Sequence, residues 1–309
     1  MKQRFSYGGQ AVIEGVLIRG RRGSALAVRR PDGTVHVEHS PLPSVSNEKL
    51  RKIPLLRGLL VLAETLILGA QALSRSAQLA VQEEAAGEEL PRWAMGGMVA
   101  ISLTFAISVF FILPLLAARA LEGLFPNILT MNLAEGILRK AILLGYIVLI
   151  GQMKDIRRVF AYHGAEHMAV HAYEHGDPLE PQALRRYPTM HPRCGTAFLL
   201  VVAVVALVVF ALLGKPPLWL GILSRILLVP VIAAISYEFI RWSGAHARNP
   251  VARLLIAPGL ALQWLTTRQP DDGQLEVAIA AMKGALEADG VPPREAAPQP
   301  PEGEGRSPL

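Results

Sequence analysis

Hydrophobic residues in this 309-residue chain are gathered into long blocks that polar segments separate. A helix needs roughly 20 mostly apolar residues to cross a bilayer. Four blocks approach or reach that length: residues 98–118, 137–153, 195–214 and 218–240. The pattern predicts a mainly α-helical, polytopic membrane bundle with about four transmembrane helices, the first of them kinked at Pro114.

A fifth apolar block covers residues 53–80, but polar side chains recur along it. They are Arg57, Glu64, Gln71 and Arg75. This recurrence favours a helix that lies in the membrane interface or against the bundle. A fifth membrane-embedded helix is the alternative interpretation.

The N-terminal segment, residues 1–45, has a different pattern. Two short apolar runs, residues 25–28 and 34–38, flank Pro31-Asp32-Gly33, which is a strong turn signal. We therefore expect a small β-rich segment that contains a hairpin. Glu14, between apolar neighbours, is expected to be a water-facing strand residue.

The rest of the chain divides by composition. Residues 46–97 hold the fifth block and an acidic linker, and residues 98–265 form the predicted bundle with a histidine-rich loop at 154–194. Residues 251–265 are apolar but contain Pro258-Gly259, which favours an interrupted, interfacial or re-entrant segment. Residues 266–291 are predicted to be an amphipathic segment with a helix at 276–288. The tail at 292–309, rich in proline, glutamate and glycine, is predicted to be disordered.

Loop charges predict the orientation. Residues 120–136 contain no lysine or arginine, whereas residues 154–193 contain six. By the positive-inside rule, both termini and the 154–194 loop are expected on the cytoplasmic side of the inner membrane. The single cysteine, Cys194, then lies on the reducing side. The net charge of +6 comes from basic residues scattered beside apolar segments, which indicates contact with membrane lipids and not with nucleic acid.

Five of the eight histidines fall between positions 163 and 191. The stretch from Tyr162 to Gly176 lacks proline and is predicted to be a helix that ends at the glycine. At about 100° per residue, its metal-binding residue types share one stripe. That stripe consists of His163, His167, His171 and Glu174, with Glu166 at its edge.

His163 to His167 reads His-x-x-Glu-His, the inverted form of the zincin motif. In such motifs the two histidines bind zinc and the glutamate activates water. Candidates for the third ligand are Glu174, His191 and Cys194. The same residue types also occur on solvated helix faces and in structural zinc sites, so the pattern leaves both readings open.

Several motifs in order resemble a bacterial membrane family known as DUF1385, over residues 7–283. They are residues 7–16, residues 162–167, residues 191–196, Pro258-Gly259-Leu260 with Gln263, and residues 265–268. The family's description as predicted metal-dependent enzymes implies a metal-dependent activity. The matching positions are His163, Glu166, His167, Glu174, His191 and Cys194. This chain has Met168 where the family often has lysine, and His171 and His175 are additional to the pattern.

These observations support a membrane-embedded, metal-dependent hydrolase at the cytoplasmic face. His163 and His167 would bind a divalent metal such as zinc, and Glu166 would be the general base. Substrates at that depth would be membrane peptides or lipid-linked molecules.

The alternative is a non-catalytic scaffold or regulatory protein. Its structural metal would hold the loop in place, and its surface would recruit a protein partner or anionic lipid. A transporter or channel is ranked last, because apart from Arg225 and Glu238 the predicted spans are nearly free of ionisable groups. Glu238 is expected to extend toward the membrane surface.

Overall fold

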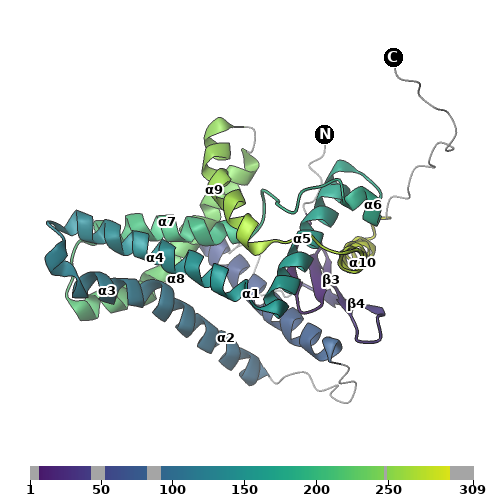
Figure 1. The fold of residues 1–309 in the computed structure, drawn as a ribbon, viewed down its shortest axis with the longest axis horizontal. Coiled ribbons are helices and arrows are strands. Elements are labelled where there is room, and N and C mark those ends of the chain that lie inside the picture. The colour runs from purple at the N-terminus through teal and green to yellow at the C-terminus, as the bar shows by residue number, and fades with distance from the viewer. Residues whose placement is uncertain (1–6, 43–52, 82–91, 247–248, 293–309) are drawn as a thin grey trace.

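The computed structural model describes residues 7–42, 53–81, 92–246 and 249–292 (Figure 1). The protein is mainly helical, with one small antiparallel sheet near the N-terminus. This confirms the predicted fold class at the level of helical content and N-terminal β-structure. The predictions of an acidic linker and a disordered tail fall mostly outside the described residues.

The sheet contains four strands in the order β1-β2-β3-β4, and all neighbours are antiparallel. The strands are β1 (Gly8–Val12), β2 (Gly15–Arg19), β3 (Gly23–Arg29) and β4 (Val35–Pro41). The predicted hairpin is confirmed as β3–β4, and Gly33 takes the left-handed conformation its turn needs (φ 86°).

A second hairpin, β1–β2, was not predicted. Ile13 and Glu14 form its two-residue turn, in which Glu14 has a positive φ of 51°. The prediction of a water-facing strand residue is therefore wrong for Glu14. Its carboxylate instead accepts hydrogen bonds from Arg158 and from the hydroxyl of Tyr162, both on α5 (Lys154–His175).

The sheet is the middle layer of a three-layer unit, because side chains alternate between its two faces. One face packs on α5 and α10 (Asp272–Ala288), and it includes Val16, Ile18, Ala25 and Ala27. The other face packs on Leu68 and Ala72 of α1 (Leu56–Ala80). Three segments far apart in the sequence thus share the core that surrounds the sheet.

Helix α1 joins this unit to the bundle. Near its start, Arg57 donates two hydrogen bonds to Glu238 of α8 (Leu218–Ala245), and near its end Arg75 pairs with Glu38 of β4. Glu238 is therefore paired with an arginine of α1, and its expected extension toward the membrane surface stays a prediction.

The bundle begins with a long irregular helix. α2 (Arg92–Ile107), the π-helical turn η2 (Ser108–Ile112) and α3 (Leu113–Ala120) follow one another without a break. Pro114 lies in the first turn of α3, directly after the π-helical turn, so the irregularity lies where the proline predicted it. A short 3₁₀ turn, η3 (Glu122–Leu124), follows.

Helices α4 (Ile128–Ile150), α7 (Thr196–Leu212) and α8 complete the bundle. α4 begins at Ile128, where Asn127 and Thr130 form a capping box, and not near residue 137 as predicted. Half of the predicted loop at 120–136 is therefore helix. Inside the bundle, Glu135 of α4 pairs with Arg139 and with Arg225 of α8, so these buried charges compensate one another.

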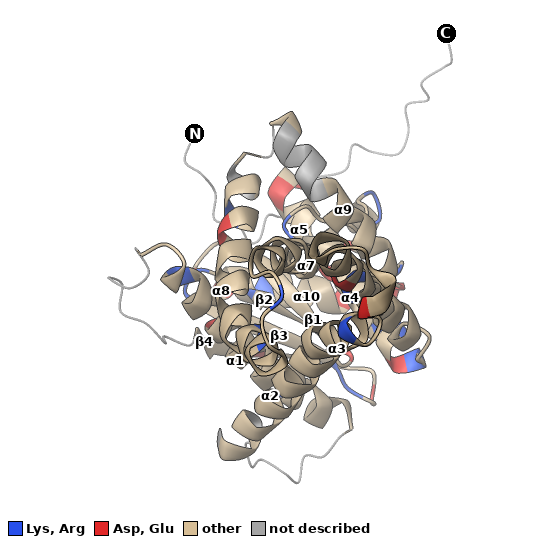
Figure 2. Cartoon of the chain, turned by 90° about the vertical axis from the view of Figure 1, so that its left-hand side faces the viewer, with Lys and Arg blue, Asp and Glu red and all other residues tan. Residues whose placement is uncertain are grey.

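Among the described residues, three helical stretches are long and apolar enough to cross a membrane: residues 56–80, 96–120 and 218–243. The last two coincide with predicted spans, and the first is the block for which an interfacial position was favoured. α7 is apolar but has only 17 residues, and α4 carries charged residues. Figure 2 shows that α2 and α7 are almost free of charged residues, whereas α3 and α4 carry some. Candidate membrane helices are thus present, while the count of four stays a prediction.

The remaining helices surround the histidine-rich segment. α5 ends at Gly176, which has a φ of 85°, and this confirms the predicted cap. α6 (Pro181–Leu184) follows, and α9 (Pro250–Thr266) runs through Pro258 without interruption, contrary to the prediction. At Gly259 a Cβ atom would lie 2.6 Å from Cβ of Ala197, so this glycine permits close packing of α9 on α7.

Candidate metal site

Small residues on α5 allow neighbouring segments to approach the histidine-rich helix closely. A Cβ atom at Gly164 would lie 2.3 Å from the carbonyl oxygen of Arg268. The chain after α9 can therefore lie directly on α5, which brings the carbonyl of Thr266 to His163.

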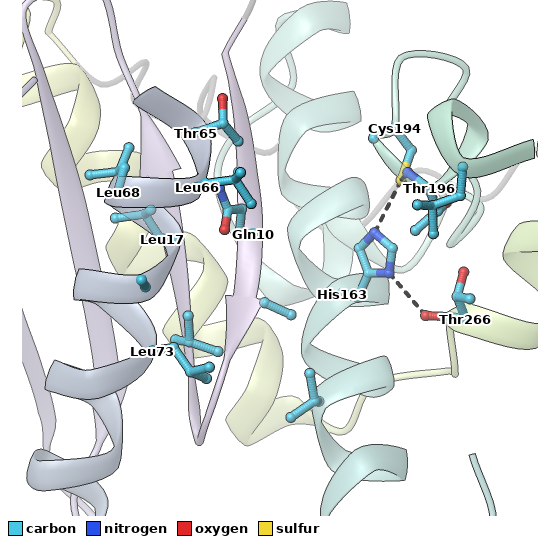
Figure 3. Close-up of a pocket in the computed structure, with 18 of the residues that line it drawn as sticks. Gln10, Leu17, Thr65, Leu66, Leu68, Leu73, His163, Cys194, Thr196 and Thr266 are labelled. Atoms are coloured by element: carbon cyan, nitrogen blue, oxygen red, sulfur yellow. Dashed lines mark hydrogen bonds between the residues drawn. The ribbon is translucent and has the colours of Figure 1, made fainter. Parts of the chain in front are cut away.

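The part of the chain that the structure describes contains two candidate ligand groups, and His163, His167 and Cys194 form the first. One ligand atom from each lies within 4.8 Å of the others. Nε2 of His163 is 3.2 Å from Sγ of Cys194, and the rings of His163 and His167 are 4.4 Å apart (Figure 3). The structure thus brings together three of the residues that the sequence singled out.

Backbone carbonyls orient both imidazole rings of this group. Nδ1 of His163 lies 2.9 Å from the carbonyl oxygen of Thr266, and Nδ1 of His167 lies 2.6 Å from that of Thr189. A carbonyl can only accept, so Nδ1 carries the proton in each ring and Nε2 keeps its lone pair. Ligating histidines in metal sites are held by this kind of bond.

Glu166 lies beside the first group and is almost fully buried, with 3% of its surface exposed. One of its oxygens is 3.5 Å from Nε2 of His167, and a Cβ atom at Gly9 would lie 3.1 Å from its Cγ, so the backbone of Gly9 packs against it. Burial raises the pKa of Glu166 above its ordinary value, since it disfavours the charged form. Burial also lowers the pKa of His167, which keeps that ring neutral.

Glu174 and His191 do not join the first group. They form a second one with His171, again with one ligand atom from each within 4.8 Å of the others. His171 was additional to the family pattern.

Protein partners already engage both rings of the second group. Nε2 of His171 donates to the carbonyl of Met190, and Nδ1 of His191 accepts from the N–H of Arg193. The proton of His191 then lies on Nε2, 3.5 Å from Glu174. Burial lowers the pKa of His171 to about 4 and lowers that of His191 as well.

Gln263 of α9 positions the segment that contains His191 and Cys194. The side chain of Gln263 is completely buried. Its oxygen accepts from the N–H of His191 at 2.8 Å, and its amide group donates to the carbonyl of the same residue at 2.9 Å. No sequence motif predicts a role in the site for Gln263. The available signal was a lone amide inside the apolar run at 251–265.

A cavity of about 2090 Å³ opens beside the first group. Its walls are mostly apolar and come from α1, α2, α4, α7 and β1. Figure 3 shows leucines of α1 on one side of this space and His163 with Cys194 on the other. The histidine–cysteine group can therefore be reached from the space between the apolar helices.

Fold and site define a helical protein with candidate membrane helices and a buried histidine–cysteine group at the end of an apolar cavity. The chain belongs to the DUF1385 family, described as a protein of unknown function, whose sequence model matches residues 53–288. This confirms the resemblance seen in the sequence.

A similar protein is the uncharacterized protein YqhQ of Bacillus subtilis (strain 168). It is 33% identical over 300 residues, which cover 93% of this chain and 94% of that protein. No solved structure matches the chain. Neither description names an activity or a metal, so the chemistry must be argued from the site.

Proposed function

We propose that this protein is a membrane-embedded, metal-dependent hydrolase that acts at the cytoplasmic face of the inner membrane. The observation that carries the proposal is the convergence of His163, His167 and Cys194 beside the buried Glu166, at the end of the cavity. The divalent metal would be zinc, since imidazole and thiolate are ligands that zinc prefers.

The donor set fits a catalytic ion better than a structural one. Three protein ligands leave a fourth position open, as catalytic zinc sites require. When bound, zinc would polarise a carbonyl group and make water a nucleophile near neutral pH. The carbonyls of Thr189 and Thr266 would hold the two imidazoles in the ligating tautomer.

Glu166 would take the proton from the attacking water and return it to the leaving group. Burial raises the pKa of this carboxyl group above its ordinary value, which favours its role as a proton acceptor and donor. Its contact with His167 places it within reach of the same centre.

The arrangement of the bundle supports the orientation predicted from charge. The turn after α3 and the turn before α8 lie at the same end, because Lys215 pairs with Glu122. That end is far from the sheet (Figure 1). With α2–α3, α4, α7 and α8 as the four spans, both chain termini would lie on the cytoplasmic side together with the sheet and α5.

A structural metal is the second candidate. The first group connects α5 with the segment before α7, and the bonds from Thr266 and Gln263 add α9. Such a site would hold the loop in place without turnover.

Measurements of metal content and turnover distinguish a catalytic metal from a structural one. We expect one zinc per chain in purified wild-type protein, none in His163→Ala, and full occupancy without hydrolysis in Glu166→Gln. Elemental analysis measures the metal, and a panel of membrane peptides and lipid-linked esters in vesicles measures turnover. The control is His39→Ala, at an exposed histidine of β4.

Zinc retained in His163→Ala would contradict the proposed ligand. Turnover retained in Glu166→Gln would contradict the proposed base. A second zinc that disappears in His171→Ala would show instead that the second group also binds metal.

A further inference from the structure

The outer edge of β1 faces the cavity. β1 is the terminal strand of the sheet, and residues 7–13 all border the cavity together with parts of α1 and α5. A terminal strand presents unpaired backbone groups along its outer side. These groups are therefore directed into the same space as the candidate metal site.

The hydrogen-bond pattern shows which groups point outward. The backbone N–H of Arg29 donates to the carbonyl of Glu14, so Glu14 is hydrogen-bonded to β3. Because hydrogen-bonded pairs alternate in an antiparallel ladder, every second residue of β2 after Glu14 is hydrogen-bonded to β3 as well. Leu17 and Arg19 then pair with β1, where Gln10 and Gly8 lie opposite them.

The backbone groups of Gly9 and Ala11 must consequently point away from the sheet. Gly9 also lies against Glu166, since a Cβ atom at Gly9 would be 3.1 Å from Cγ of Glu166. Within the described residues, no backbone group pairs with the outward N–H and C=O of Ala11.

We infer that the substrate is a polypeptide in extended conformation that pairs with the outer edge of β1 as an added strand. This inference rests on the proposed function and names the substrate class for it. Pairing at Ala11 would place the peptide beside Glu166, because Gly9 already contacts that carboxylate. Peptide recognition by strand addition uses main-chain hydrogen bonds of this kind.

Backbone chemistry favours a peptide over a lipid chain. A peptide N–H and C=O in a mostly apolar cavity are costly without partners. An acyl or prenyl chain offers neither a donor nor an acceptor, whereas an extended peptide offers both at the spacing of β1. The substrate would then also contain the amide bond to be hydrolysed.

The space beside β1 suits this ligand. A Cβ atom at Gly8 would meet no atom within 4 Å, so the start of the strand is open. The cavity of about 2090 Å³ exceeds the roughly 300–1,000 Å³ of ordinary small-molecule pockets. Its apolar walls suit the side chains of a segment released from a membrane-spanning region.

The test compares three probes on full-length, zinc-loaded protein in detergent: a valyl-leucyl-alanyl hydroxamate, acetohydroxamate and dodecanoyl hydroxamate. Ala11→Pro removes only the outward N–H, because the residues on either side of Ala11 make the hydrogen bonds between β1 and β2. We expect this variant to bind the peptidyl probe about tenfold more weakly by calorimetry, with acetohydroxamate unchanged. Ala11→Val, which adds bulk but keeps the N–H, should bind like wild type.

A second measurement uses wild-type protein alone, in case Ala11→Pro does not fold. Methylation of the peptidyl probe's amide nitrogens should also weaken its binding about tenfold. Equal binding of methylated and unmethylated probes would overturn the pairing while leaving the metal site intact. Tighter binding of dodecanoyl hydroxamate, unaffected by Ala11→Pro, would indicate a lipid substrate instead. If none of the probes binds, the proposed function itself fails.

Discussion

Among single residues, Gln263 contributes to the candidate site in a way that few other side chains could reproduce. It donates to the carbonyl and accepts from the N–H of His191, which requires a side chain with both functions. The carbonyls of Thr189 and Thr266 differ in this respect, since nearly any residue at those positions supplies a carbonyl. The orientation of His163 and His167 therefore depends on where the backbone runs.

We predict that Gln263→Leu weakens zinc binding without removing a ligand. The change leaves two buried backbone groups of His191 unpaired, at a cost of about 3 kcal/mol in the free energy of unfolding. Cys194 lies three residues further on, so its position shifts and zinc affinity should fall at least tenfold. Competition with a chromophoric chelator measures the affinity.

Gln71→Leu, at an exposed amide of α1, is the matched control and should leave both quantities unchanged. Wild-type zinc affinity in Gln263→Leu would show that the segment before α7 keeps its place without this side chain.

Among secondary-structure elements, the contact between the β1–β2 turn and α5 holds the sheet against the histidine-rich helix. Glu14 accepts from Arg158 and Tyr162, so the hydrogen bond and charge of Arg158 hold the pKa of Glu14 below its ordinary value of 4.5. Because this turn begins β2 and ends β1, its attachment also determines where Gly9 meets Glu166.

This contact predicts a pH-dependent contribution to stability. A carboxyl group with a lowered folded-state pKa stabilises the fold above the unfolded value, and the effect is lost as pH falls through the folded value. Arg158 is 51% exposed, so solvent screening limits the contribution to about 1 kcal/mol. The unfolding free energies of wild type and Glu14→Gln should differ by that amount at pH 7, and the difference should shrink as the pH is lowered from 4.5 toward 3.

Glu180→Gln, at an exposed residue directly before α6, provides the comparison and should show no such pH-dependent difference. A wild-type advantage that persists unchanged at pH 3 would mean that Glu14 acts through packing or turn geometry instead of charge.

In the whole molecule, the sheet unit and the turns at the far end of the bundle would lie on opposite sides of the membrane. Glu135, Arg139 and Arg225 form a compensated group inside the bundle, with Arg225 stacked 4.2 Å from the ring centre of Phe210. The charges of these buried groups compensate one another, so they do not indicate an ion pathway of the kind that a transporter or channel needs.

The four-span arrangement makes a direct prediction about accessibility. A cysteine at Lys215, in the turn between α7 and α8, should react with a membrane-impermeant maleimide added to intact cells. A cysteine at Asp32, in the β3–β4 turn, should react only after permeabilisation. Cys194 is buried and gives the same background in both variants. Labelling of Asp32→Cys in intact cells would reverse the orientation.

The predicted elements succeeded where the signal was local. The helix that ends at Gly176 and the hairpin at Gly33 depend on residues close together in the chain, and both are present. Failures came where distant contacts override a local signal. Pro258-Gly259 reads as an interruption, but Gly259 packs on α7 inside an unbroken helix. Glu135 reads as part of a loop, but two arginines compensate its charge within the bundle.

Sequence alone was enough to place His163 and His167 one helical turn apart and to nominate Cys194, because spacing along a helix fixes which side chains share a face. The sequence could not show which of the remaining candidate ligands belong to the same group. Only the packing of α9 and the segment before α7 against α5 put Glu174 and His191 with His171. The packing of β1 against α5 likewise brought Gly9 to Glu166. Those groupings depend on contacts between segments up to about 160 residues apart, which no local pattern of residues encodes.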